Sequence, residues 1–198
     1  MIESSQNPPK FWYTRGYLPH FDGGAINQFI TFRLADSLPQ NILRQLKIEV
    51  ERSLISDIEY ARKIEKWLDQ NRGACHLKDE RIADLLVETL KKFDGEKYKL
   101  LAWVIMPNHV HLLLRPIGDV SLSEIMHSIK SFTAHKANKI LQRKGQFWSK
   151  EYFDRFIRDY HHFLKTIDYI ENNPVKAGLC PKRSDWRYGS AYGADGGA

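Results

Sequence analysis

A predicted β-hairpin with two histidines in one strand is the feature that most constrains how this chain can fold. Residues 98–106 and 109–114 are rich in β-forming residues, and Pro107-Asn108 between them suits a tight turn, with Asn able to take a positive φ. Side chains alternate along a strand, so His109 and His111 project from one face and their apolar neighbours from the other. Such a pair is half of a divalent-metal site, although two hydrogen-bonded core histidines are the more frequent explanation.

The remainder of the chain predicts one further strand and several helices. The strand covers residues 28–34, which alternate and are rich in β-formers. Helices are predicted over residues 39–70, 78–93, 121–145 and 159–173. A capping-box pattern at Ser121 begins the third helix, and Asn173-Pro174 is expected to end the last one. Only three strands are clear, and residues 187–190 are a weak candidate for another.

Size and composition indicate a cytoplasmic protein of one domain. The chain has 198 residues, of which 42% are hydrophobic and 27% are charged, which is ordinary for a globular protein. Residues 1–10 do not resemble a signal peptide, and no apolar run approaches the ~20 residues that cross a bilayer. Cys75 and Cys180 form neither a disulfide framework nor a CxxC pair, which fits a reducing compartment. We expect a single domain over residues 1–198 and no membrane partner.

The net charge of +6 is concentrated in one segment. Residues 130–165 contain nine basic and three acidic residues, so this segment carries the whole excess, and aromatic residues lie among its cations. A solvated surface is the ordinary explanation of scattered charge, but this mixture also suits contact with phosphates and unpaired bases. Residues 47–97 contain twelve acidic and eleven basic residues. We expect this balanced helical region to be scaffold.

Tyr169 and Asn173 lie four residues apart in the last predicted helix, so they share one face of it. By itself, a tyrosine at such a position is more often a half-buried aromatic at the edge of a core. Tyr152 and Tyr160 are rival candidates for a reactive tyrosine. Neither of these rivals has a ligand-type residue four positions on.

Several separated motifs, taken in order, resemble a known family. They are the His-hydrophobe-His (HUH) triplet 109–111 with 102–108 before it, and residues 130–133, 147–159, 168–178 and 184–186. Together they are similar to the REP-associated tyrosine transposases, a branch of the single-tyrosine HUH transposases of bacterial insertion sequences. The resemblance covers most of the chain from about residue 100 onward and, more loosely, the first strand.

The resemblance implies an α+β fold with a ferredoxin-like antiparallel sheet. The HUH motif would lie on a central strand, and helices packed on one face of the sheet would present the tyrosine. Residues 47–97 are more than compact members of the family need, so we expect them to form an additional helical insert within the single domain.

The resemblance also implies a metal-dependent endonuclease and strand transferase that acts on single-stranded DNA, usually folded as hairpins. Tyr169 would attack a phosphodiester and leave a 5′-phosphotyrosine and a free 3′-OH, and Lys165, one turn earlier, could favour its phenolate. His109 and His111 would hold Mg²⁺ or Mn²⁺, with Asn173 as a third ligand, because an amide oxygen suits such hard ions.

Contacts with DNA are expected from the basic and aromatic segment. The phosphate-binding candidates are Lys136, Lys139, Arg143, Arg155 and Arg158. Trp148 or Tyr152 is a candidate for stacking on a base. The protein would act as a monomer or a homodimer.

Two other functions remain open at this point. A domesticated relative could bind DNA hairpins without cutting them. An HxH site could instead serve a hydrolase or oxidoreductase of small molecules, which would need a third histidine or a carboxylate at matching spacing. His76, His127 and His135 have no clear relation to the pair.

Overall fold

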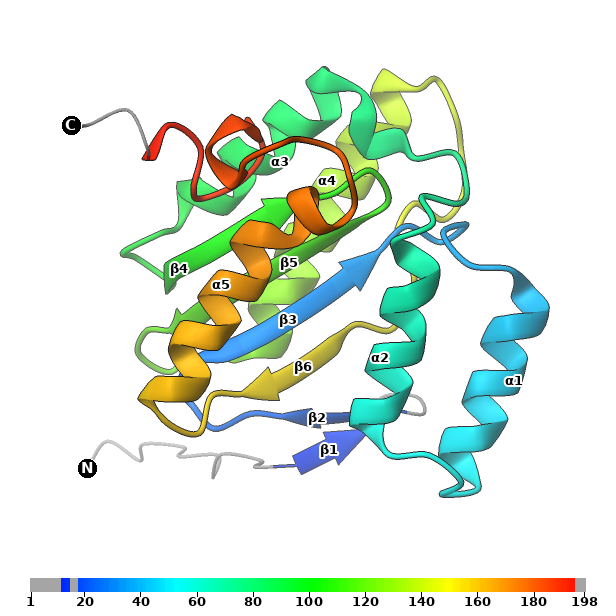
Figure 1. Ribbon diagram of the computed structural model, residues 1–198. Coiled ribbons are helices and arrows are strands. Elements are labelled where there is room, and N and C mark those ends of the chain that lie inside the picture. The colour runs from blue at the N-terminus through cyan, green and yellow to red at the C-terminus, as the bar shows by residue number, and fades with distance from the viewer. Residues whose placement is uncertain (1–11, 15–17, 195–198) are drawn as a thin grey trace, which may run out of the picture.

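The centre of the protein is a four-stranded antiparallel sheet, seen in a computed structural model that describes residues 12–14 and 18–194 (Figure 1). Its strands are β3 (Gln28–Arg33), β4 (Tyr98–Ile105), β5 (His109–Pro116) and β6 (Phe153–Phe156). They are ordered β4-β5-β3-β6. Strands β4 and β5 form the predicted hairpin, and β5 is a central strand, as expected for the one that carries the two histidines.

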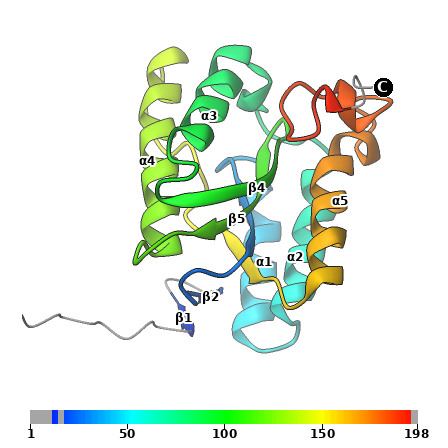
Figure 2. The ribbon, with the colours of Figure 1, turned by 90° about the vertical axis from the view of Figure 1, so that its left-hand side faces the viewer.

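Helices cover both faces of this sheet. α3 (Glu80–Lys92) and α4 (Leu122–Ile140) lie on one face, while α5 (Tyr160–Lys176) crosses the other; α2 (Asp57–Leu68) and α1 (Gln40–Glu51) lie on that second side too (Figure 2). The succession β3-α3-β4 and then β5-α4-β6, with this strand order, is the ferredoxin-like arrangement. The expected ferredoxin-like α+β fold is therefore confirmed. Helices cover both faces of the sheet, and α5 presents Tyr169 from one of them.

Alternation along the strands divides the core into two parts. Val110, Leu112 and Leu114 of β5 pack in the larger cluster with α3 and α4. Leu113 faces the other way and packs with Ile170 of α5 in a smaller cluster. His109 and His111 are on the same side as Leu113, because all three have odd positions in the strand. The apolar pattern of β5 therefore directs both imidazoles toward α5 and α2.

Two helix starts are capped by side chains, and the one at Ser121 is the capping box expected from the sequence. Ser121 accepts a hydrogen bond from the backbone of Glu124, whose carboxylate accepts one from the backbone of Ser121 in return. Asp159 caps α5 by accepting from the backbone of His162 at 2.7 Å. Such caps satisfy amide groups that have no partner within the helix.

Other helix boundaries differ from expectation. Residues 39–70 form two helices, because a turn at 52–56 that contains Ser53 with a φ of 54° separates α1 from α2. α4 ends at Ile140 and does not reach Gly145. The prediction that Pro174 ends the last helix is wrong, since α5 continues to Lys176. The proline lies in the last turn, where its missing amide removes only one hydrogen bond of the helix.

The fourth strand, β6, comes from a segment without clean apolar alternation, because Asp154 and Arg155 are at its centre. Residues 187–190 do reach the sheet, but only through a bridge between Val104 and Gly189 at the edge of β4. A separate two-stranded sheet is formed by β1 (Trp12–Thr14) and β2 (Pro19–Phe21).

Part of the segment 47–97 belongs to the ferredoxin-like unit itself, because α3 is one of its two helices. The helices additional to that unit and preceding the HUH strand are α1 and α2, which share a small core of their own. A short 3₁₀ turn, His76–Lys78, leads into α3, and another, Arg183–Asp185, follows α5. Within residues 12–14 and 18–194, none of the helices has the length and apolar character needed to cross a membrane.

Candidate metal and tyrosine site

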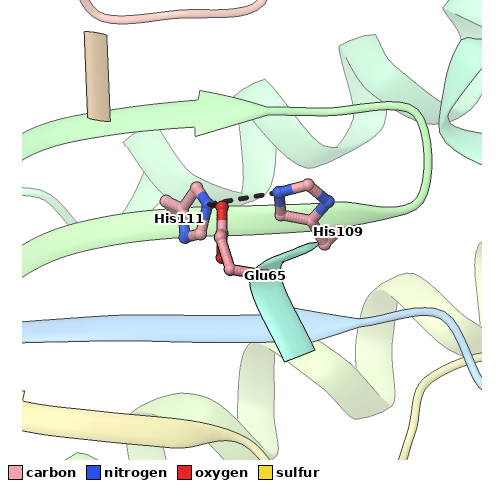
Figure 3. Close-up of side chains that lie close together, drawn as sticks. All are labelled: Glu65, His109 and His111. Atoms are coloured by element: carbon pink, nitrogen blue, oxygen red, sulfur yellow. Dashed lines mark hydrogen bonds and ion pairs between the residues drawn. The ribbon is translucent and has the colours of Figure 1, made fainter. Parts of the chain in front are cut away.

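Three potential metal ligands converge on one face of the sheet (Figure 3). The Nε2 atoms of His109 and His111 lie 3.1 Å apart, and both side chains are fully buried. Glu65 of α2 reaches them, with its Oε1 at 3.2 Å from His111 Nε2. Two nitrogens bound to one ion at about 2.1 Å lie about 3 Å apart when the angle between them is near 90°. The separation of the two imidazoles therefore fits a shared cation.

A hydrogen-bond chain sets which nitrogen of His109 carries the proton. Asn108 donates from its amide nitrogen to the carbonyls of Arg72, at 3.1 Å, and Leu68, at 3.4 Å. Its Oδ1 therefore faces His109 Nδ1, 2.8 Å away, and can only accept. Nδ1 of His109 is consequently the protonated nitrogen, and the lone pair of Nε2 points into the cluster.

The turn before the HUH strand thus has a different role from the one expected for it. Asn108 does not take a positive φ. Its side chain instead ties the residues at and after the end of α2 to His109. On the other imidazole, Thr31 Oγ1 lies 2.8 Å from His111 Nδ1 and can accept its proton. With the imidazoles held this way, two ring nitrogens and a carboxylate face one another, which is a donor set for a cation.

Helix α5 brings Tyr169 and Asn173 to the same place. Asn173 is buried, and its amide nitrogen lies 3.2 Å from Glu65 Oε1 and 3.4 Å from His111 Nε2. Its Oδ1 is buried with no hydrogen-bond partner. Rotation of the amide by half a turn would exchange these two atoms and direct the oxygen at the cluster. An unpartnered amide oxygen at this position fits the expectation that Asn173 completes a metal site.

Tyr169 packs beside the histidines, with ring centres 5.4 Å from His111 and 5.8 Å from Phe29. Burial raises the pKa of its phenol well above the usual value, and the negative charge of Glu65, to which it is hydrogen-bonded, raises it further. This direction is opposite to the one that a neighbouring Lys165 was expected to impose. The phenol is therefore neutral in the structure and needs a proton acceptor before it can act as a nucleophile.

The pKa values of His109 and Glu65 favour the protonation states that bind a metal ion. Burial lowers the pKa of His109 to about 3, and the neighbouring His111 contributes in the same direction, so this imidazole is neutral. Burial alone would raise the pKa of the Glu65 carboxyl, but the charge and hydrogen bond of His111 outweigh it and hold that pKa below its usual range. A neutral imidazole and an ionised carboxylate are the forms that bind metal.

An open groove of about 530 Å³ runs past the cluster between α2 and α5. Strands β3 and β6 form its floor through Phe29, Thr31, Arg33, Phe153 and Arg155. The cations along it are Arg33, Arg62, Lys66, Arg155, Lys165 and Lys176, and the anions are Glu65, Asp69 and Glu151. Outside the ligand cluster, the groove is therefore mainly basic.

A family model described as "Transposase IS200 like" matches residues 67–173. The chain belongs to the IS200-like transposase family. The matched segment contains His109, His111, Tyr169 and Asn173, while Glu65 lies two residues before it. The comparison supports the family that the separated motifs suggested.

Two curated relatives agree with this assignment. The REP-associated tyrosine transposase of Escherichia coli K12 is 33% identical over 96 residues, which are 48% of this chain and 55% of that protein. A putative REP-associated tyrosine transposase of Haemophilus influenzae is 29% identical over 105 residues, 48% of this chain and 60% of the relative. The chain thus matches little more than half of the length of each.

A solved structure supports the fold of this IS200-like transposase. It is described as a REP-associated tyrosine transposase bound to a REP hairpin. It superposes with a TM-score of 0.55 and 20% identity, over 90% of this chain and 81% of the other. At this level of identity the similarity establishes the shared α+β architecture.

The structure brings few of the expected DNA-binding residues to the groove. Arg155 lines it, and Arg158 is exposed in the loop before α5. Lys136 and Lys139 are on α4, which covers the opposite face of the sheet. Arg143 follows α4 and donates to His76 Nε2 at 2.8 Å.

The aromatic candidates for base stacking are buried. Trp148 is 4% exposed, donates from Nε1 to Thr133 at 2.9 Å and packs on Phe32 in the core. Tyr152 is 6% exposed and packs on His20, with ring centres 4.5 Å apart. Their rings present little surface to a base. Among the rival tyrosines, Tyr160 is largely exposed at the start of α5, and neither rival is in the ligand cluster.

Glu65 is the site residue that the sequence did not reveal. It lies in the balanced segment that was expected to be scaffold, next to the buried stripe of α2 formed by Tyr60, Ile64 and Leu68. Three basic residues, Arg62, Lys63 and Lys66, lie close to it in sequence, so nothing local separates it from a solvated glutamate. Only the packing of α2 beside β5 shows that this carboxylate faces the histidines.

Proposed function

We propose that this protein is a metal-dependent DNA strand transferase that cuts single-stranded DNA with Tyr169 as the nucleophile. One observation carries the proposal. Helix α5 places Tyr169 and Asn173 against a His109, His111 and Glu65 cluster formed by parts of the chain that are distant in sequence. A core tyrosine without such a role would not need two buried imidazoles and a carboxylate beside it.

His109, His111 and Glu65 would hold the metal ion, and Asn173 would complete the set through its amide oxygen. Nitrogen and carboxylate ligands together suit a divalent ion such as Mn²⁺, and Mg²⁺ is the hard-ion alternative. The bound ion would offset the negative charge that develops on the phosphate during the reaction. Asn108 and Thr31 would orient the two imidazoles for this task.

Tyr169 would attack the phosphorus atom of a phosphodiester with its phenolic oxygen. A bond forms between that oxygen and phosphorus, and the bond from phosphorus to the 3′ oxygen breaks, which leaves a 5′-phosphotyrosine and a free 3′-OH. The phenol loses its proton to solvent as this bond forms, and the departing 3′ oxygen takes one up, so the step is proton-neutral overall. Glu65, the hydrogen-bond partner of the phenol, would orient its oxygen for attack. Attack by a 3′-OH on the phosphotyrosine would rejoin a strand without another energy source.

The substrate that we propose is a DNA hairpin with an unpaired strand at its base. A groove with aromatic and basic residues on its floor suits a single strand, because bases stack on aromatic rings and phosphates bind cations. The hairpin follows from the structural relative, which was solved with a REP hairpin.

Covalent trapping tests this proposal. Hairpin DNA labelled at its 3′ end is incubated with protein and Mn²⁺ and then separated on a denaturing gel. We expect a labelled protein–DNA adduct that chelator abolishes, that Tyr169→Phe abolishes, and that the matched variant Tyr160→Phe retains. An adduct that survives in Tyr169→Phe would refute the role of Tyr169. Hairpin binding without any adduct would instead support a non-catalytic hairpin-binding protein.

A further inference from the structure

We propose that Arg33 binds a phosphate of the DNA strand in the groove, next to the metal cluster. Arg33 is the last residue of β3 and is paired in register with His109 of β5. Cross-strand partners have Cβ atoms about 5 Å apart and point to the same face of the sheet. Arg33 lines the groove on the side of the sheet that carries both imidazoles. This proposal rests on the proposed function and names the group that would hold its substrate.

Arg33 is a buried cation without a carboxylate partner. It is 7% exposed, and among residues 12–14 and 18–194 no acidic group forms an ion pair with it. Its hydrogen bonds go to two neutral oxygens, the Leu34 carbonyl at 3.3 Å and Ser37 Oγ at 3.2 Å, and both come from Nη1. Burying a charge without a counter-charge is costly, and proteins usually compensate it with an anion.

The fold does not depend on those two hydrogen bonds. The Leu34 carbonyl also accepts from Ser37, from its hydroxyl at 2.8 Å and from its backbone amide at 3.3 Å. Removal of the guanidinium therefore leaves that carbonyl satisfied, and the serine hydroxyl keeps the acceptor to which it donates. The guanidinium of Arg33 is costly to bury, and its neighbours do not need it. An anionic ligand that pairs with it would explain why it is there.

A phosphodiester is the anion that fits this position. Its two unesterified oxygens match the two-pronged donors of a guanidinium, and the groove is open enough for a chain to pass. The other cations of α2 and α5 that line the groove, such as Arg62 and Lys165, are exposed, so water and salt screen them. Arg33 is screened much less and would fix the position of one phosphate relative to His109.

The test separates binding from cleavage. Full-length protein with Tyr169→Phe is titrated with single-stranded DNA in chelator over a series of KCl concentrations, and binding is read by fluorescence anisotropy. Arg33→Met, Arg33→Lys and, as the matched surface control, Arg44→Met are compared. Arg44 is exposed on α1, outside the groove.

We expect Arg33→Met to weaken binding at least tenfold and to lower the salt slope by about 0.7, the value for one phosphate contact on a single strand. Arg33→Lys should weaken binding by an intermediate factor, because lysine keeps the positive charge but lacks the paired N–H donors of the guanidinium. The Tm of Arg33→Met should equal or exceed that of the parent, and Arg44→Met should match the parent in both measurements.

Binding by Arg33→Met within twofold of the parent would overturn the proposal, even where the parent with Tyr169 intact cuts DNA. A Tm that falls by several degrees in Arg33→Met, with Arg33→Lys normal in Tm and binding, would also overturn it, because the arginine would then be structural. A parent that neither binds nor cuts single-stranded DNA would refute the proposed function and this inference together.

Discussion

At the scale of single residues, the site depends on side chains that orient the candidate metal ligands and are not ligands themselves. Asn108 is the clearest case, because its amide group donates to the carbonyls of Leu68 and Arg72 while its oxygen accepts from His109. One side chain thereby sets the protonated nitrogen of an imidazole and joins the hairpin to the end of α2. Partners of this kind commonly affect metal affinity about as strongly as weak ligands do.

Asn108→Ala is expected to weaken Mn²⁺ binding by about 10–100-fold, because His109 loses the acceptor that fixes its tautomer and ring orientation. Isothermal titration calorimetry with Mn²⁺ measures this. Asn172→Ala is the control, since the Asn172 side chain donates to Asp168 within α5, away from the cluster. Equal Mn²⁺ affinity in Asn108→Ala and the parent would show that the hydrogen bond does not orient the ligand.

At the scale of elements, an ion-pair cluster joins the β1–β2 sheet to the edge strand β6. His20 of β2 is 1% exposed and lies 2.5 Å from Asp154 and 3.4 Å from Glu151, with Tyr13 and Tyr152 packed on its ring. Burial would lower the pKa of this imidazole, but the hydrogen bonds and charges of the two carboxylates outweigh burial and raise it to about 9. His20 is therefore charged at neutral pH.

The contribution of His20 to the free energy of unfolding should depend on pH. Its pKa is raised from 6.5 in the unfolded chain to about 9, so the stabilisation is complete below pH 6.5 and is lost as the pH rises through 9. The lost amount is at most about 3 kcal/mol. Urea unfolding of the parent and of His20→Gln at pH 6 and pH 9.5 measures it. The difference between the two proteins should shrink at pH 9.5, and a constant difference would contradict the raised pKa.

At the scale of the whole molecule, the candidate ligands come from three elements that only the tertiary fold brings together. Glu65 is on α2, the two histidines are on β5, and Asn173 is on α5. An ion bound there would link the two helices α2 and α5 to the central strand β5. Binding to the native state alone would then stabilise the whole fold by mass action.

Mn²⁺ at 100 times its Kd should stabilise the protein by about 2.7 kcal/mol. For a chain of this length, that is a rise in Tm of about 5–10 °C. Differential scanning calorimetry with and without Mn²⁺ measures it. Glu65→Gln should lose most of the rise, because it removes the anionic ligand, whereas Glu88→Gln on the exposed side of α3 should keep it. A full rise in Glu65→Gln would exclude Glu65 as a ligand.

The part of this molecule that could be predicted from sequence is the part with local periodicity. The hairpin around His109 and the shared face of Tyr169 and Asn173 follow from alternation in strands and spacing in helices. Glu65 and Arg33 could not be predicted, because their roles come from contacts with distant segments. The burial of Trp148 was missed for the same reason, since a Trp beside cations has the same local pattern in a core as on a surface.

The short connection between β6 and α5 has a consequence for how the site is assembled. Only residues 157–159 separate Phe156 from Tyr160, and Ile157 is held by a backbone hydrogen bond to Asn27. The four Cα–Cα steps from Phe156 to Tyr160 span at most about 14 Å, so the start of α5 stays near the end of β6. In this structure Tyr169 and the histidines beside it belong to one polypeptide, and a tyrosine joined to DNA would be tethered to the sheet by those three residues.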